Sequence, residues 1–256
     1  MSAEAESHTT WVPAPSVDNS FETKLLPAVL SGVAGRVDVI CFLGLGGLFA
    51  AHITGNLVIM AAHIVTGGTA QTAQILSVPV FIVVLGLTRL VAAGLEALRV
   101  PSLLPLLALQ LALLAAFLGL GVTIGSPLDT GAPKAVIAGM MGVSAMAVQN
   151  ALVQVSIQGA PSTAVMTTNI TRFVVDAGTV LLGHDARETV SARNRAKHTW
   201  QAIVGFAGGC ALGAMCQAAF GMWSLVLPLI GALLALALCF RTDAASPSAT
   251  ATSSIA

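Results

Sequence analysis

Eight apolar segments follow one another along this chain, and they restrict its fold more than any other feature. Most reach the roughly 20 residues that an α-helix needs to cross a bilayer, but the second has only about 14 and the sixth is marginal. Only 9% of the residues are charged, against about 25% in a typical soluble domain. The pattern predicts an all-α, polytopic helical membrane protein with six to eight helical segments. The segments span residues 27–50, 52–66, 72–97, 103–124, 134–157, 164–182, 199–220 and 222–240.

The two ends of the chain differ from this apolar region. Residues 1–26 are polar and lack the basic start and apolar core of a signal peptide, so we expect a cytoplasmic tail. Residues 241–256 are of low complexity and are predicted to be disordered. Residues 27–240 are predicted to form a single transmembrane domain.

Basic residues in the connections predict the orientation, because Lys and Arg gather on the cytoplasmic side of a membrane. If all eight segments cross, Lys134 lies on the side of the termini and Arg99 lies opposite; if the second and sixth are re-entrant, six cross and Lys134 becomes the exception. Both alternatives place both termini in the cytoplasm and the protein in a bacterial inner membrane. We expect a basic loop before the seventh segment to lie against anionic lipid headgroups. It carries Arg187, Arg193, Arg195 and Lys197.

A weak internal repeat divides the chain into two halves, at about 27–125 and 134–240. "VDVICFLGLGGLFAAHITGN" ends in Thr54-Gly55-Asn56, and "QNALVQVSIQGAPSTAVMTTN" ends in Thr167-Thr168-Asn169. Asp38 and Asn150 precede these triplets at nearly the same distance. The halves are inverted if six segments cross and parallel if eight do. Inverted repeats with broken helices near the bilayer midplane are common in transporters.

Four short motifs carry a resemblance to a known family. Gly35-Arg36-Val37-Asp38, Thr54-Gly55-Asn56, Gln149-Asn150-Ala151 and Thr167-Thr168-Asn169 resemble, in order and spacing, the YoaK family of bacterial multi-pass membrane proteins, also described as a domain of unknown function. The resemblance covers about residues 25–240. It implies a fold and a membrane location, and it implies no activity.

Two interpretations of the polar groups at the breaks stay open. Backbone groups freed by a broken helix must face protein or a water-filled cavity in lipid. In the first interpretation, the breaks line a solute site formed by Thr54, Asn56, Asn150, Thr167 and Asn169. In the second, the same side chains only cap helix ends and hold helices together. Asp38 lies near the predicted midplane, where a carboxylate is a candidate for proton or cation coupling.

Other polar and small residues favour structural roles. Arg172 and Asp176 are spaced i,i+4 and are predicted to form a structural ion pair. His52 and His63 lack a third ligand, so we expect no metal, and no cofactor is expected either. Gly205, Gly209 and Gly213 form a small-residue stripe for close packing with another helix of the chain or with a second copy in a homo-oligomer.

Three functions follow from these observations. The leading hypothesis is a secondary transporter or channel-like carrier of a small polar solute, and the alternative is a non-transporting membrane scaffold. The third is an intramembrane lipid-modifying enzyme that uses Asp176 and His184. Because no GxSxG, HExxH or P-loop motif occurs, we expect no enzyme. The expected partners are the lipid bilayer and the solute, while zero net charge without a basic stripe argues against nucleic acid.

Overall fold

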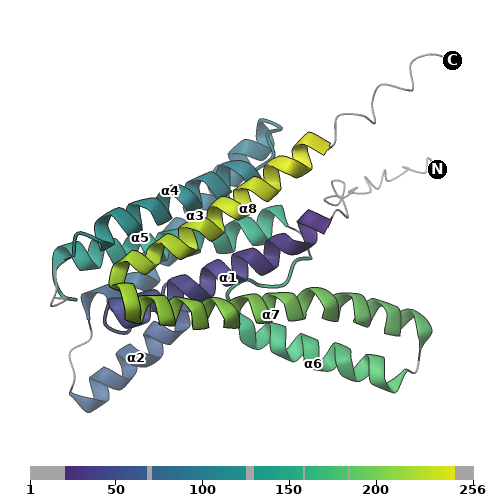
Figure 1. Ribbon diagram of the computed structural model, residues 1–256, viewed down its shortest axis with the longest axis horizontal. Coiled ribbons are helices and arrows are strands. Elements are labelled where there is room, and N and C mark those ends of the chain that lie inside the picture. The colour runs from purple at the N-terminus through teal and green to yellow at the C-terminus, as the bar shows by residue number, and fades with distance from the viewer. Residues whose placement is uncertain (1–20, 68–70, 125–129, 158, 184, 246–256) are drawn as a thin grey trace, which may run out of the picture.

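The computed structural model describes residues 21–67, 71–124, 130–157, 159–183 and 185–245, and this part of the chain is helical without a strand (Figure 1). The all-α prediction is confirmed. Five stretches are long and apolar enough to cross a membrane, and the last of them, Ala186–Phe240, contains two helices between which the chain reverses direction. The helices are α1 (Phe21–Gly44), α2 (Ile53–Thr66), α3 (Thr72–Ala97), α4 (Leu103–Gly121), α5 (Pro133–Ser156), α6 (Met166–Leu182), α7 (Ala186–Phe220), the 3-10 helix η1 (Gly221–Leu225) and α8 (Val226–Ala245).

The ends of the helical region differ from the predicted boundaries. α1 begins at Phe21 and contains Pro27, so the last residues of the predicted polar tail are helical. α8 continues to Ala245, inside the stretch predicted to be disordered. The rest of the two predicted tails, 1–20 and 246–256, lies outside the described residues.

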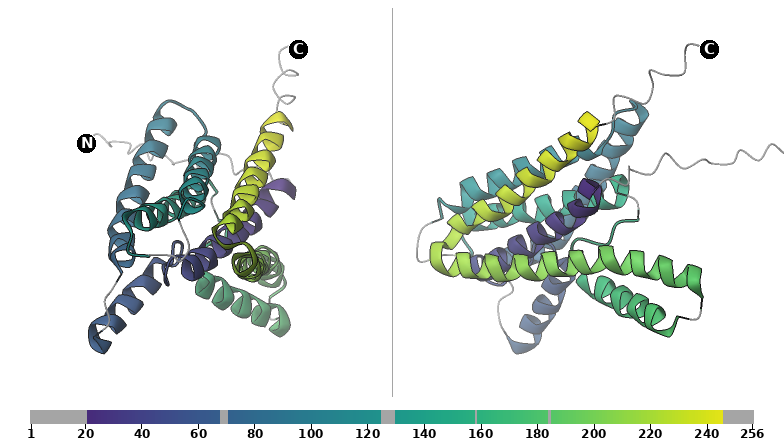
Figure 2. Two further views of the ribbon diagram at one scale, coloured as in Figure 1. Left: turned by 60° about the vertical axis from the view of Figure 1, so that its left-hand side comes forward. Right: turned by 45° about the vertical axis from the view of Figure 1, so that its right-hand side comes forward.

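The helices form two halves that pack in the same way. α1–α4 and α5–α8 each contain a long first helix, a short second helix and two further long helices. α1 packs against α7 and α8 of the second half, and α5 packs against α3 and α4 of the first. The short helices α2 and α6 pack on α3 and α7, and Figure 2 shows α2 standing away from the bundle.

The two halves are inverted relative to each other. Gly139 near the start of α5 lies against Leu45 and Leu48 after α1, whereas Gln149 near its end reaches the carbonyl of Leu30 near the start of α1. α1 and α5 therefore run in opposite directions. The first turn of α1 and the last turn of α8 lie at the same end of the bundle (Figure 1). This arrangement corresponds to the six-crossing alternative of the sequence.

The stretch 187–197 is helical, so the prediction of a basic loop is wrong. It forms the first turns of α7, which has 35 residues. Asp185 caps the helix, because its Oδ1 accepts the Arg187 N–H at 2.7 Å. A helix of this length extends about 52 Å, well beyond the roughly 30 Å of a hydrocarbon core. The predicted apolar segment 199–220 is thus only the second part of α7.

The glycine stripe of α7 packs against α1 of the same chain. A Cβ on Gly205 would collide with the carbonyl oxygen of Ala28, and one on Gly209 would collide with that of Gly32. One turn further on, a Cβ on Gly213 would lie 2.6 Å from the Val39 side chain. The close approach runs in parallel along both helices, and it accounts for the glycines without a second copy of the chain.

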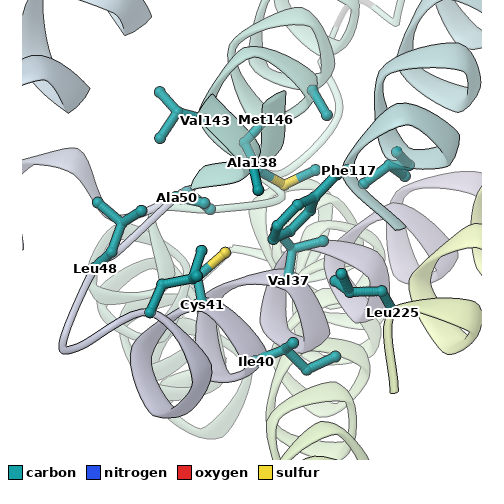
Figure 3. Close-up of a cluster of buried hydrophobic side chains, with 14 of the residues drawn as sticks. Val37, Ile40, Cys41, Leu48, Ala50, Phe117, Ala138, Val143, Met146 and Leu225 are labelled. Atoms are coloured by element: carbon teal, nitrogen blue, oxygen red, sulfur yellow. The ribbon is translucent and has the colours of Figure 1, made fainter. Parts of the chain in front are cut away.

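The core lies where α1, α4 and α5 meet, and η1 closes one side of it. Figure 3 shows Val37 and Cys41 of α1, Phe117 of α4 and Met146 of α5 in one cluster, all fully buried. Gly142 of α5 leaves the room that the Phe117 ring occupies. The core holds α1 in place at the level of its polar residues.

The outer surface of the bundle exposes large apolar side chains. Ile82 and Leu90 of α3 are 62% and 69% exposed, and Ile230 of α8 is 56% exposed. In water such a surface would be costly, whereas in lipid it is the expected face of a membrane protein. The apolar short helix α2 shares this property, since its Val58 is 70% exposed.

Candidate functional site

The first helix break lies between α1 and α2 and begins at a pair of glycines. α1 ends at Gly44, and Gly46 and Gly47 follow with φ of 67° and 82°, in the left-handed region that favours glycine. The chain then runs without helical hydrogen bonds until α2 begins at Ile53. Its backbone N–H groups therefore need acceptors from elsewhere.

Asp38 of α1 supplies those acceptors. Its Oδ1 accepts the N–H groups of Ala50 and Ala51 at 2.8 Å and 2.6 Å, and that of His52 at 3.4 Å. Its Oδ2 lies 2.5 Å from Nδ1 of His52. Asp38 is 3% exposed, and its hydrogen-bond partners within the described residues all belong to this loop. Asp38 thus fixes the broken segment against α1, as an N-terminal cap supplied by a neighbouring helix.

The pair of Asp38 and His52 fixes the tautomer of the imidazole. An ionised carboxylate can only accept, so Nδ1 of His52 carries a hydrogen. Among the described residues, no hydrogen bond involves Nε2 of His52, and the ring packs edge-on against Phe206 of α7 with 5.3 Å between ring centroids. The imidazole is partly exposed.

Asn56, in the first turn of α2, closes the same loop from the other side. Its side-chain oxygen accepts the N–H of Phe49 at 2.9 Å, and its Nδ2 donates to the carbonyl of Phe49 at 2.7 Å and to Oγ of Ser77 at 2.8 Å. The side chain is fully buried. Gly55 beside it lies directly under the Phe49 ring, which a Cβ would reach at 2.8 Å. Gly55 and Asn56 of the triplet therefore hold Phe49.

The second break repeats the central contact of the first. Nδ2 of Asn169 donates to the carbonyl of Ser162 at 2.6 Å, and the two residues are seven apart, as are Asn56 and Phe49. The oxygen of Asn169 is buried and has no hydrogen-bond partner within the described residues, so the second break is closed by one bond from its asparagine to the loop backbone and the first by two. The two asparagines of the sequence repeat occupy equivalent places.

Gln149 is a buried polar residue whose role sequence reasoning missed. Its Nε2 donates to the Leu30 carbonyl and to Oγ1 of Thr163, both at 3.0 Å, and its Oε1 accepts from Gln110 at 2.7 Å. Thr163 lies fourteen residues after Gln149, as His52 lies fourteen after Asp38. By these contacts the counterpart of Asp38 is Gln149, the neighbour of the expected Asn150. The equal separation of fourteen residues in the two halves was the sequence signal that could have identified Gln149.

A cavity of about 540 Å³ lies at the first break, between α1, α2 and α7. Asp38, His52 and Thr54 supply its polar groups, and three phenylalanines and two valines supply most of its apolar wall. Thr54 is exposed to this space, whereas Asn56 is not among the residues that line it. The full lining is Asp38, Val39, Phe42, Phe49, His52, Thr54, Gly55, Val58, Phe206 and Cys210.

The two other predicted site residues lie apart from this cavity. Asn150 is half-buried and donates to the Met146 carbonyl of its own helix at 2.9 Å. Thr167 is exposed on α6. Of the five residues expected to line one solute site, the structure puts Thr54 on the cavity, and Asn56 and Asn169 on loop backbone.

Each residue of the Gly35-Arg36-Val37-Asp38 motif serves a different neighbour. A Cβ on Gly35 would meet the backbone of α7, where Sγ of Cys210 lies 3.4 Å from the Gly35 carbonyl. Arg36 projects toward Gly231 of α8, with Nη1 3.1 Å from where a Cβ would stand. Val37 joins the core and Asp38 holds the loop. Through this motif, α1 contacts α7 and α8 of the second half and also holds the loop of the first break.

The ion pair of Asp176 differs from the expected one. Asp176 of α6 is buried, and its Oδ1 accepts from Nη2 and Nε of Arg195 on α7 at 2.6 Å and 3.1 Å. Arg172 makes no ion pair within the described residues. Arg195 of the neighbouring helix pairs with Asp176 in place of Arg172, which lies four residues away on the same helix. The pair fastens α6 to α7.

The fold and the two breaks define a polytopic all-α integral membrane protein, built from two inverted halves with a short second helix in each. The family described as "Protein of unknown function (DUF1275)" matches residues 26–239, and the chain belongs to this family. No curated protein and no solved structure matches the chain.

Proposed function

We propose that this membrane protein is a secondary transporter or channel-like carrier of a small solute that binds at the first helix break. The observation that carries the proposal is the joining of two inverted halves through α1 and α5, with a largely apolar cavity at the first of the two matched breaks. In carriers of this architecture, one half rocks against the other around a site formed by broken helices.

The chemistry of the cavity indicates the class of solute. Its wall is largely apolar, and three polar side chains converge on it: Asp38, His52 and Thr54. Such pockets bind a molecule by its apolar body and orient it by few hydrogen bonds. We therefore expect a solute with a polar group that bonds His52 and Thr54 and an apolar part that contacts the phenylalanines. The sequence hypothesis of a small polar solute is thereby narrowed to a small amphipathic one.

Asp38 and His52 supply a route for coupling. Nε2 of His52 has no hydrogen-bond partner in the described part of the chain, so a proton taken up there makes an imidazolium next to the Asp38 carboxylate. If the Nδ1 proton passes to Oδ2 of Asp38, the neutral carboxyl still accepts the N–H groups of Ala50 and Ala51 at Oδ1, but more weakly than the charged carboxylate does. Proton binding at this pair is thereby linked to the strength of the hydrogen bonds between Asp38 and the loop backbone. Asp38 acts in this proposal through the broken segment as well as through its charge.

The distribution of basic residues supports a cytoplasmic location for the start of α1 and the end of α8. Arg99 and the first turns of α7 lie at the end of the bundle where α1 begins, and Lys134 lies at the other. Basic residues favour the cytoplasmic side, so α1 begins and α8 ends there, in the inner membrane of a bacterial cell. The narrower assignment to the YoaK family stays a prediction, supported by the order of the four motifs.

The test of the carrier uses accessibility and does not require a known solute. Thr54→Cys is made in a chain whose four cysteines are replaced by serine, and a membrane-impermeant maleimide is added to inside-out or right-side-out vesicles. A carrier that alternates exposes the cavity to both sides, so label enters from either. Labelling from one side only contradicts the proposal. The matched control is Thr66→Cys, at the end of α2 and outside the cavity.

A second candidate function is the non-transporting scaffold. The bonds of Asn56 and Asn169 to loop backbone favour it, because both side chains are fully buried and already bonded to the chain itself. A scaffold does not alternate, so the maleimide labels Thr54→Cys in at most one of the two vesicle orientations. Asn56→Ala then lowers stability without changing any response to solutes in a thermal-shift screen.

A lipid-modifying enzyme has less support. Its suggested pair was Asp176 and His184, and His184 lies outside the described residues. Asp176 is bound to Arg195 and is buried, so its carboxylate is already engaged. The expectation that the protein is not an enzyme stays a prediction, and incubation of the purified protein with labelled phospholipid checks it.

A further inference from the structure

A second cavity, of about 630 Å³, lies between α6, α7 and the segment that follows α5. It is more polar than the first and is separate from the first break. Two arginines, Arg172 from α6 and Arg195 from α7, face it together with Asn194, His198 and two threonines. We call it the α6–α7 pocket.

The two arginines give the α6–α7 pocket an excess of positive charge. Asp176 is the acidic residue in its lining, and its side chain is 8% exposed while that of Arg195 is 58% exposed. Nε and Nη2 of Arg195 donate to Asp176, which leaves Nη1 available. Arg172 is exposed and makes no ion pair within the described residues, so its guanidinium also has donors to offer.

Two exposed tryptophans indicate the depth of the α6–α7 pocket in the membrane. Trp200 is 45% exposed on α7, directly after the pocket residue Thr199, and Trp223 is 63% exposed beyond the other end of this helix. Residues 200–220 of α7 extend about 30 Å, the thickness of a hydrocarbon core. Tryptophan gathers at both membrane interfaces. Arg195 therefore lies at the level of the lipid headgroups.

We propose that the α6–α7 pocket binds a phosphate group, supplied by the headgroup of an anionic phospholipid. Guanidinium groups recognise phosphate through paired, charge-assisted hydrogen bonds, and Arg172 and Arg195 present them from two helices. Basic pockets at the cytoplasmic ends of membrane helices suit such headgroups. The bound phosphate bridges α6 to α7 beside the Asp176–Arg195 pair. This proposal does not depend on transport.

The test measures binding of three probes to the detergent-purified full chain by native mass spectrometry. The probes are dihexanoyl phosphatidylglycerol, which is anionic, dihexanoyl phosphatidylcholine, which carries the same phosphodiester with a cation, and inorganic phosphate. The variants are Arg172→Gln and the matched control Arg187→Gln, which removes one charge from the same end of α7 outside the pocket.

The proposal predicts that phosphatidylglycerol binds wild type more tightly than phosphatidylcholine. Arg172→Gln weakens this binding about tenfold, the effect of losing a charge-assisted pair, and Arg187→Gln leaves it within about twofold. Arg172→Lys, which keeps the charge but loses the planar fork, gives an intermediate loss. Arg172 is exposed, so these variants are expected to fold.

Two outcomes overturn the assignment. Equal weakening by Arg172→Gln and Arg187→Gln means general attraction to a basic surface, and equal binding of phosphatidylglycerol by all variants means that the pocket takes no part. If inorganic phosphate binds as tightly as phosphatidylglycerol with the same loss in Arg172→Gln, the phosphate site stands and its source is a soluble anion.

Discussion

The side chain of Asn56 forms a two-bond ring with the backbone of Phe49, accepting its N–H at 2.9 Å and donating to its carbonyl at 2.7 Å. This is the pairing that one strand residue offers another, made here by an amide side chain. It replaces the hydrogen bonds that the chain gives up between α1 and α2. In the second half, Asn169 makes one of these two bonds, because its Nδ2 donates to the carbonyl of Ser162.

The difference between the two closures predicts unequal losses of stability. Asn56→Ala removes three hydrogen bonds at a fully buried site and leaves the N–H and carbonyl of Phe49 without their partner. We expect a loss of about 3–5 kcal/mol in the free energy of unfolding. Asn169→Ala removes one short bond and also an oxygen without a partner among the described residues, so the expected loss is about 1–2 kcal/mol.

Denaturation of the purified protein, followed by circular dichroism, measures both values. Thr179→Val serves as the control, because the Thr179 hydroxyl bonds only the backbone of its own helix at an exposed position. If Asn169→Ala destabilises more than Asn56→Ala, the described roles of the two asparagines are wrong.

Much of the fold was readable from the sequence because lipid imposes strong rules. Apolar stretches of sufficient length become helices, and both breaks were found at the polar triplets, since unpaired backbone in lipid needs such side chains. Two matched asparagines, Asn56 and Asn169, indicated a repeat but left open whether its halves are inverted or parallel, and the opposite directions of α1 and α5 show that they are inverted. The repeat was weak by identity, but the positions that satisfy backbone groups were retained in both halves.

Two errors at the polar sites arose where neighbouring residues or helices compete for one role. Gln149 and Asn150 are adjacent and both polar, and only the packing of Leu30 and Thr163 around Gln149 decides which is buried. Asp176 had a partner four residues away in sequence, but Arg195 approached from α7. Such choices depend on contacts between segments far apart along the chain, and local spacing carries no information on them.

Asp38 is expected to tolerate loss of its charge better than loss of its shape. In Asp38→Asn the side-chain oxygen can still accept the N–H groups of Ala50 and Ala51, and His52 can change tautomer to accept from the new amide. Asp38→Ala leaves these buried N–H groups without an acceptor. We expect a loss of about 3 kcal/mol or more for alanine and about 1 kcal/mol for asparagine, measured as above.

The same two variants separate coupling from folding. Once a solute is found, uptake into proteoliposomes is driven by a proton gradient in wild type, and Asp38→Asn is expected to fold yet to lose this dependence. Proton-driven uptake that is unchanged in Asp38→Asn contradicts the coupling role of Asp38.

Gln149 is expected to matter more for stability than its neighbour Asn150. Gln149→Leu leaves the Leu30 carbonyl and Gln110 without the partners they have in the fully buried network. The expected cost is about 2–4 kcal/mol. Asn150→Ala loses one bond to its own helix, at Met146, and is expected to change stability by less than about 1 kcal/mol. Thermal unfolding in detergent compares them, and equal melting temperatures contradict the network's role.

The contact of α1 with α7 predicts opposite effects for two adjacent glycines. A Cβ on Gly209 would collide with the carbonyl of Gly32, which is backbone and cannot turn away, so the helices must separate. Gly209→Ala is expected to cost about 1–3 kcal/mol through lost packing along the interface. Gly208 has nothing within 4 Å of its Cβ position, so Gly208→Ala gains helix propensity without a clash.

The melting temperature is therefore expected to fall in Gly209→Ala and to stay or rise in Gly208→Ala. The pair changes the same number of atoms in the same helix at adjacent positions, so effects on detergent binding and on expression are matched. Gly35 offers a check from the other helix, since a Cβ there would collide with the Phe206 carbonyl. If Gly35→Ala and Gly209→Ala both melt like wild type, α1 and α7 do not pack at the distance described, and the link between the two halves lies elsewhere.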